Sequence, residues 1–150
     1  MSSGRTASMS TEVVVDSSVI AALVTPELYS DWSSNRLSEY DDFHALDLNF
    51  YEVANAIKHK VSDRFDAKDA VVAFAQAVEL MNLYAVHNFS EVITDAIALA
   101  LELDIAVYDA AFLSLAEKLD TRLLTLDHKL AKKLEGTKYY ALVECPNKKI

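Results

Sequence analysis

Short runs of β-branched and apolar residues alternate with helical patterns along the whole chain, and this alternation is the strongest constraint on its fold. In residues 47–61, for example, Phe50, Val53 and Ile57 have the i, i+3, i+7 spacing of a helix face. Strands that alternate with helices favour an α/β fold with a largely parallel sheet. We therefore predict strands over residues 11–15, 43–46, 105–108, 122–126 and 140–143, and helices over residues 19–24, 27–39, 47–61, 66–83, 90–103, 110–119 and 128–134.

The length of 150 residues suits one domain, because two domains would each be too small to bury a good core. We place this domain at residues 11–150. Residues 1–10 (MSSGRTASMS) are small and polar, and we expect a flexible lead or an expression scar there. The longest apolar runs have six residues, far below the roughly 20 that cross a bilayer, so we expect no membrane partner.

Glycine and cysteine are scarce, and this excludes several kinds of site. The only glycines, Gly4 and Gly136, lie 132 residues apart, so they cannot form a Walker loop or a dinucleotide-binding G-x-G-x-x-G motif. The single Cys145 excludes an internal disulfide and a multi-cysteine zinc site, and a cytoplasmic location is the default expectation. Asp104 and Asp120 stand after helical patterns where glycine is usual, and aspartate tolerates the left-handed conformation required there.

Four acidic residues occupy positions from which their side chains can meet. Asp16, Asp109 and Asp127 each follow a predicted strand directly, and ligands of open parallel sheets bind beyond the carboxyl ends of the strands. Glu52 lies in the first or second turn of the helix after the second strand. Each acid alone also suits helix capping, and Glu52 fits the third position of a capping box that begins at Asn49.

Carboxylates crowded together repel one another, and a divalent cation between them removes the repulsion. Oxygen ligands without cysteine or histidine suit Mg²⁺ or Mn²⁺ better than zinc. Such ions commonly support phosphodiester hydrolysis without a protein nucleophile. The sequence also lacks a plausible triad: its histidines show no spacing that pairs them with each other or with Cys145, and we expect them at the surface or in the core. They are His44, His59, His87 and His128.

Three segments carry a resemblance to a known family. They are VVVDSSVIAAL near the start, FYEVANAI in the middle and VYDAAFLSLAEKLDTRLLTLDHKLAK near the end. In order and spacing they resemble the PIN-domain ribonucleases, most of all the VapC toxins of toxin–antitoxin systems, over about residues 13–143. The resemblance implies a three-layer PIN-like fold, in which a mainly parallel sheet of four or five short strands is flanked by helices. Asp104 and Asp120 depart from the family, which usually has glycine there.

The resemblance also implies a function and a set of site residues. The activity is a metal-dependent endoribonuclease that uses Mg²⁺ or Mn²⁺, with RNA as substrate, a cognate antitoxin protein as partner, and a homodimer as the assembly. The quartet of catalytic and metal-binding acids maps onto Asp16, Glu52, Asp109 and Asp127. Residues that orient the carboxylates or water, as outer-shell groups do, map onto Ser18, Asn55 and Thr125.

The charge is unevenly distributed. The net charge of −9 disfavours a nucleic-acid partner, but residues 118–150 carry +4 and the remaining 117 residues carry −13. Lys129, Lys132 and Lys133 follow Asp127 on one short predicted helix, where they can contact an RNA backbone. An ordinary solvated helix face explains these lysines equally well.

Two other functions are open at this stage. A housekeeping RNA-processing nuclease would have the same site and no antitoxin, and the sequence does not separate it from a toxin. A receiver-type signalling module would also be acidic and α/β, but it needs adjacent acids after the first strand and a lysine at the end of a late strand. Asp16 is instead followed by Ser17 and Ser18, and no lysine follows residues 140–143 directly.

Overall fold

A five-stranded parallel sheet forms the centre of the protein, which a computed structural model describes over residues 11–149. The strand order is β4-β3-β2-β5-β6, and every neighbouring pair is parallel. The predicted mainly parallel sheet is therefore confirmed. The strands are β2 (Glu12–Val15), β3 (Asp42–Leu46), β4 (Ala85–His87), β5 (Arg122–Leu124) and β6 (Val143–Glu144).

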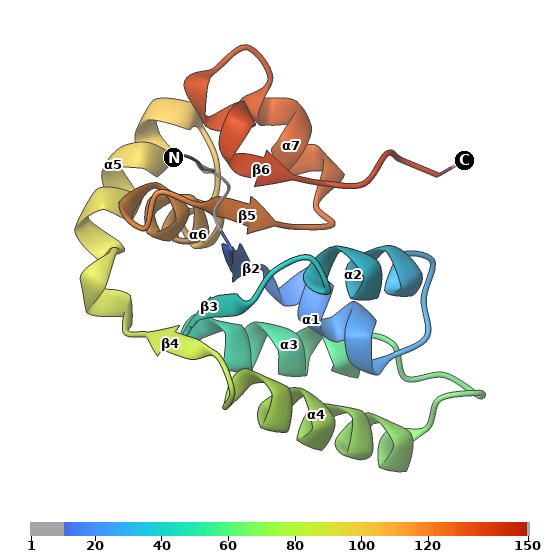
Figure 1. Cartoon of the computed structure of the whole chain (residues 1–150). Coiled ribbons are helices and arrows are strands. Elements are labelled where there is room, and N and C mark those ends of the chain that lie inside the picture. The colour runs from blue at the N-terminus through green and yellow to red at the C-terminus, as the bar shows by residue number, and fades with distance from the viewer. Residues whose placement is uncertain (1–10, 150) are drawn as a thin grey trace, which may run out of the picture.

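Helices cover both faces of the sheet and give it three layers (Figure 1). One face packs against α1 (Ser17–Val24), α2 (Ser30–Leu37), α3 (Leu48–Lys58) and α4 (Ala67–Met81). The other face packs against α5 (Ile93–Leu103) and α6 (Val107–Lys118), with α7 (His128–Leu134) and two short 3₁₀ helices, η1 (Phe89–Glu91) and η2 (Lys138–Leu142), nearby.

The central strand β2 shows why both faces are covered. Its apolar side chains alternate between the faces, so that Val13 and Val15 join one hydrophobic cluster and Val14 joins the other. All three valines are fully buried. A strand buried on both faces appears in the sequence as an unbroken β-branched run, which is the pattern of residues 13–15.

The predicted strand over residues 105–108 is wrong. Helix α5 ends at Asp104, whose φ of 54° is left-handed, and the amide of Ile105 bonds the carbonyl of Ala100 at 3.2 Å. Ala106 is then the N-cap of α6, so Asp109 lies in the first turn of a helix and does not follow a strand. Four apolar residues cannot by themselves distinguish a buried strand from the start of a buried helix.

Two further predictions concern the sheet edges. The predicted strand over residues 140–143 is mostly the 3₁₀ helix η2, and only Val143 of that range belongs to β6. The sequence analysis did not predict β4, because its three residues are mostly exposed and have no apolar alternation. The left-handed conformations predicted at Asp104 and Asp120 are confirmed, each with a φ of 54°.

The lead predicted over residues 1–10 lies outside the described residues. Within residues 11–149, no helix is both long enough and apolar enough to cross a membrane.

Candidate active site

Two of the four predicted acids lie at the same edge of the sheet, because they follow two neighbouring strands. Val15, the last residue of β2, pairs with Leu124, the last residue of β5, and the amide of Asp16 bonds the carbonyl of Leu124 at 3.0 Å. Asp127 follows β5 after a short loop and is the N-cap of α7. The other two acids come from helices, Glu52 from α3 and Asp109 from the first turn of α6.

Two hydroxyl groups hold the carboxylate of Asp16. Its Oδ2 accepts hydrogen bonds from Ser18 Oγ at 2.5 Å and from Thr125 Oγ1 at 2.9 Å. Asp16 occupies the N-cap position of α1, yet its side chain makes no capping hydrogen bond. The structure therefore does not support the capping interpretation of this acid, and it brings Ser18 and Thr125 to Asp16.

The same hydroxyl groups also fix the loop that leads from β5 to Asp127. Ser18 Oγ accepts a hydrogen bond from the amide of Leu126, and Thr125 Oγ1 accepts one from the amide of Asp127, both at 3.0 Å. Asp127 Oδ1 accepts the amide of Leu130 at 3.0 Å, so the capping interpretation does hold for one oxygen of this acid.

Glu52 is held by a pair of residues that the sequence analysis missed. Its Oε1 accepts a hydrogen bond from Ser17 Oγ at 2.8 Å, and Ser17 Oγ accepts one from Asn49 Nδ2 at 3.0 Å. The fully buried amide of Asn49 also bonds the carbonyl of Val15 at 3.2 Å and the amide of Leu46 at 2.7 Å. Asn49 thus joins the ends of β2 and β3 to Glu52.

The capping box proposed between Asn49 and Glu52 is absent, because α3 begins two residues earlier than that box requires. Its N-cap is Asp47, whose side chain accepts the amide of Leu48 at 2.8 Å. One sequence signal could have identified Asn49. It lies four and eight residues before Val53 and Ile57, so it is a polar residue on the buried stripe of the helix.

Other predicted site residues make no contact with the acids. Asn55 is exposed, and its side-chain amide makes no hydrogen bond within residues 11–149, whereas its backbone carbonyl contacts His59 Nδ1 at 2.7 Å. Lys133 turns toward the end of α5, where its Nζ donates to the carbonyl of Asp104 at 2.6 Å. Lys129 and Lys132 instead line a cavity beside α7. The structure thus divides the three lysines between two places.

Burial and the charges of neighbouring acids raise the pKa of three of these carboxyl groups. Burial, and then the charges of Asp16 and Asp109, raises the pKa of Glu52 to about 7, against the hydrogen bond from Ser17 that lowers it. Burial, and then the charges of Asp127 and Asp16, raises the pKa of Asp109 to about 6. The pKa of Asp16 is also raised, chiefly by burial. These mutual effects show that the four acids, hereafter the acid cluster, share one electrostatic environment.

The acid cluster lacks a counter-charge from the protein. None of the ion pairs within residues 11–149 involves Asp16, Glu52, Asp109 or Asp127. No three acidic, histidine or cysteine side chains in that range stand close enough together to hold a metal ion as they are placed. The donor set is nonetheless the one that Mg²⁺ and Mn²⁺ prefer, because it offers carboxylate oxygens alone.

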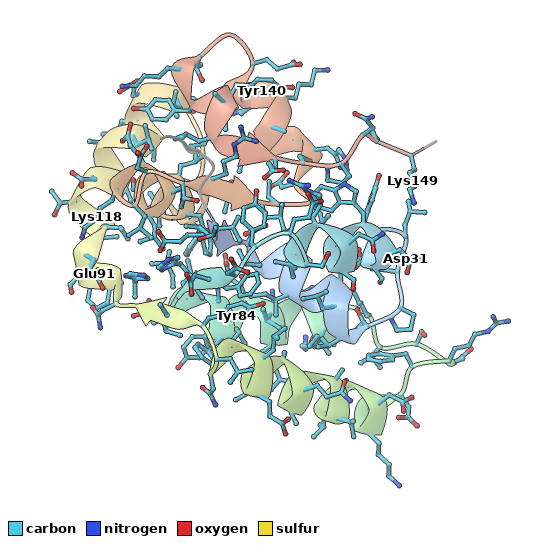
Figure 2. All side chains as sticks on the ribbon, in the orientation of Figure 1. Asp31, Tyr84, Glu91, Lys118, Tyr140 and Lys149 are labelled. Carbon is cyan, nitrogen blue, oxygen red and sulfur yellow. The ribbon has the colours of Figure 1, made fainter. Side chains whose placement is uncertain are left out.

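A second cluster of ionisable side chains lies on the α5–α6 face of the sheet. His44 Nδ1 and His87 Nε2 are 2.9 Å apart, although their sequence spacing gave no sign of a pair. The outer nitrogen of each ring contacts a carboxylate, His44 with Glu12 at 2.8 Å and His87 with Glu91 at 3.1 Å. Figure 2 shows Glu91 beside Lys118, whose Nζ is 3.7 Å from Glu91 Oε1. We call these five residues the histidine cluster.

Known proteins share both the sequence pattern and the fold. A sequence profile of the family described as PIN domain matches residues 13–135. Ribonuclease VapC3 of Pyrobaculum aerophilum is 42% identical over 123 residues, which cover 81% of this chain and 94% of that protein.

Solved structures agree on the architecture. A toxin–antitoxin complex from Klebsiella pneumoniae contains a chain that matches with a TM-score of 0.67 at 16% identity, over 91% of this chain and 99% of that one. PAE2754 from Pyrobaculum aerophilum matches with a TM-score of 0.58 at 26% identity, over 87% and 90% of the two chains. The sarcin-ricin loop cleaving toxin VapC20 of Mycobacterium tuberculosis matches with a TM-score of 0.63 at 16% identity, over 80% and 93%.

Proposed function

The chain belongs to the PIN domain family, and on that basis we propose that it is an Mg²⁺- or Mn²⁺-dependent endoribonuclease, the toxin of a toxin–antitoxin pair. The observation that carries the proposal is the acid cluster. Burial together with the charges of neighbouring acids raises the pKa of Asp16, Glu52 and Asp109 at one edge of the sheet, and no cation within residues 11–149 pairs with any of the four acids. A receiver-type module does not agree with this family membership.

We assign metal binding to Asp16, Glu52, Asp109 and Asp127. When bound, a divalent cation supplies a water of lowered pKa and stabilises negative charge on the phosphate oxygens. The remaining work falls to the protein. Hydroxyl groups of Ser18 and Thr125 hold the carboxylate of Asp16. Ser17, which Asn49 bonds in turn, holds the carboxylate of Glu52. Both carboxylates would therefore keep their orientation when a cation binds.

Protons compete with the cation for the same carboxyl groups. With a pKa of about 7 for Glu52 and about 6 for Asp109, both groups are partly protonated near neutral pH in the absence of metal. Metal binding requires the deprotonated forms, so it releases protons and becomes stronger as the pH rises through this range.

Partner proteins are suggested by apolar side chains that the core does not use. Ile93, Ile97 and Leu101 recur every four residues on α5 and are exposed, Leu101 by 78%. We propose that a second copy of the chain covers this stripe and that an antitoxin covers the acid cluster. Light scattering of the Leu101→Glu variant tests the dimer: the parent should be dimeric at micromolar concentration, and the variant monomeric.

An RNA cleavage assay tests the nuclease. The parent should cut RNA only with Mg²⁺ or Mn²⁺, and Asp16→Asn should reduce the rate by a factor on the order of 10³, since it removes one charged ligand. Asp95→Asn is a matched control, because Asp95 is an exposed acid on α5 outside the cluster. Metal-dependent cleavage that survives in Asp16→Asn would contradict the proposal.

A growth experiment separates a toxin from a housekeeping nuclease. Expression of the parent should arrest growth, expression of Asp16→Asn should not, and co-expression of the neighbouring open reading frame should restore growth. A nuclease that cuts RNA in vitro but leaves growth unaffected would favour the housekeeping role.

A further inference from the structure

A cavity of about 540 Å³ opens between α7 and the C-terminal segment 145–149. Six of the residues that line it offer groups that could recognise a ligand, and we refer to it as the lysine cavity. These residues are Lys129, Lys132, Tyr140, Cys145, Asn147 and Lys148. The volume lies within the usual range for small-ligand sites, which is about 300–1,000 Å³.

The three lysines of this cavity have no partner. Lys129, Lys132 and Lys148 are exposed, and none of their ammonium groups makes a hydrogen bond or ion pair within residues 11–149. Glu135 is the one acid in the cavity lining. By contrast, Lys133 on the same helix is tied to Asp104, 3.6 Å from its carboxylate. The cavity therefore presents an excess of positive charge to any ligand.

The outer wall of the lysine cavity is held in place by specific contacts. His128 Nε2 lies 2.9 Å from the carbonyl oxygen of Pro146, and the amide of Lys149 donates to Tyr29 Oη at 2.9 Å. The ring of Tyr29 in turn packs against that of His128, with centroids 5.4 Å apart. In Figure 1 this red segment leaves β6 and runs past α7 toward α2, and Figure 2 places Lys149 at its far end.

The lysine cavity adjoins the acid cluster. Helix α7 starts directly after Asp127, so Lys129 and Lys132 lie within two turns of that acid. Cys145 lines the cavity from the other side, and burial, followed by the charges of Asp127 and Asp16, raises the pKa of its thiol to about 11. The acids do not line the cavity themselves, but its wall begins at His128, the residue after Asp127.

We propose that the lysine cavity is a nucleotide subsite, which binds one unpaired nucleotide of the RNA strand next to the phosphate that is cut. This inference rests on the proposed nuclease function and extends it. Each of the three ammonium groups contacts a phosphate of the nucleotide or of its neighbours in the strand, the ring of Tyr140 stacks on the base, and Asn147 hydrogen-bonds the sugar or base edge.

The shape of the site sets a requirement on the substrate. A base inside a duplex is stacked and paired, so it reaches such a cavity only from a loop, a bulge or an end. The subsite therefore selects single-stranded RNA at the cutting position. Stacking on a tyrosine tolerates any base, so the cavity on its own gives preference for an unpaired nucleotide without strong base specificity.

Binding of a short fluorescent single-stranded RNA to the catalytically inert Asp16→Asn protein tests the subsite. The affinity is measured by anisotropy at several salt concentrations. Lys129→Gln, Lys132→Gln and Lys148→Gln should each weaken binding about 3- to 10-fold and reduce the salt slope by about 0.7, the value for one lost phosphate contact on a single strand. Tyr140→Leu should weaken binding and leave the slope unchanged.

Lys138→Gln is the matched control, because Lys138 is an exposed lysine outside the cavity that pairs with Glu117 at 4.0 Å. A duplex of the same sequence serves as the second control and should bind more weakly. The subsite is overturned if the three cavity variants keep the slope of Asp16→Asn, or if the duplex binds as tightly as the single strand.

A chemical reporter lies inside the same cavity. Cys145 is the only cysteine of the chain, so maleimide labels a single thiol. RNA should slow this labelling several-fold in Asp16→Asn, and unchanged labelling at saturating RNA would overturn the subsite. If the parent cuts RNA while these binding tests fail, the subsite alone is wrong. If the parent neither cuts nor binds RNA, the nuclease function is wrong as well.

Discussion

Two clusters of ionisable side chains lie on one sheet and satisfy their charges in opposite ways. In the histidine cluster five groups form a chain of contacts from Glu12 to Lys118, in the order carboxylate, imidazole, imidazole, carboxylate and ammonium. In the acid cluster four carboxyl groups share one electrostatic environment, and within residues 11–149 their side-chain hydrogen-bond partners are hydroxyl groups alone. The first arrangement supplies its own counter-charges, whereas the second has none from within residues 11–149.

The contrast supports the proposed assignment of the metal site to the acid cluster. Each carboxylate of the histidine cluster has an imidazole partner, so that cluster is stabilised by its own members and needs no ligand. Carboxyl groups of one sign, part-buried together, destabilise the charged state and therefore favour either a proton or a metal cation. The cluster that the fold leaves unsatisfied is thus the one that can bind and use an ion.

The largest expected difference between the clusters is in activity. Asp109→Asn should reduce Mg²⁺-dependent RNA cleavage by a factor on the order of 10³. His87→Gln, in the histidine cluster, should leave the cleavage rate within about twofold, since that ring contacts none of the four acids. A large loss of activity in His87→Gln with an intact fold would remove the distinction between the clusters.

The second expected difference is in the response to metal. If Mg²⁺ binds only the folded protein, a concentration 100 times its Kd raises the free energy of unfolding by about 2.7 kcal/mol. Thermal unfolding of the parent should therefore shift upward by several degrees with Mg²⁺. The shift should be much smaller in Asp109→Asn and unchanged in His87→Gln. An equal shift in all three proteins would place the Mg²⁺ site elsewhere.

The third difference concerns pH in the absence of metal. The folded-state pKa values of about 7 for Glu52 and about 6 for Asp109 lie above the unfolded values, which are near 4. The folded state therefore binds more protons than the unfolded state between about pH 4 and pH 7, and its stability falls as the pH rises through this window. Unfolding curves with a chelator should show this fall, and saturating Mg²⁺ should reduce it.

The smallest expected effect is in the histidine cluster itself. His44→Gln removes one side of the 2.9 Å contact with His87 and should lower the free energy of unfolding by about 1 kcal/mol. The double variant with His87→Gln should cost less than the sum of the two single changes, because both remove the same interaction. Strict additivity, measured by denaturant unfolding, would show that the two rings act independently.

The sequence predicted that the four acids could meet better than it predicted the elements that hold them, and their role as the site stays a prediction. The strands that precede Asp16 and Asp127 indicate the positions of these two acids. The scarcity of glycine indicates that Asp104 and Asp120 adopt the left-handed conformation at turns. Asp109 was named for its position after a strand, but that segment is the start of α6. A carboxylate can reach the same sheet edge from either element, so the error in the element left the residue unaffected.

The partners of the acids could not be found in the same way. Ser17 and Ser18 are adjacent, yet Ser17 bonds Glu52 while Ser18 bonds Asp16. Which hydroxyl bonds which carboxylate depends on how α1 and α3 pack together, and this tertiary packing cannot be read from the sequence. The pairing of His44 with His87 has the same origin, since it depends on the register between β3 and β4.

The burial of α6 has a consequence for how the activity can be controlled. Residues 110–116 of this helix are all buried in the core, directly after Asp109. The backbone of Asp109 therefore cannot leave the acid cluster without the rest of α6. Amide hydrogen exchange in this helix should be as slow as exchange that requires global unfolding. An inhibitor that works by distorting the site would have to unfold the core, so effective inhibition must come from a competitor that occupies the site while its architecture stays intact.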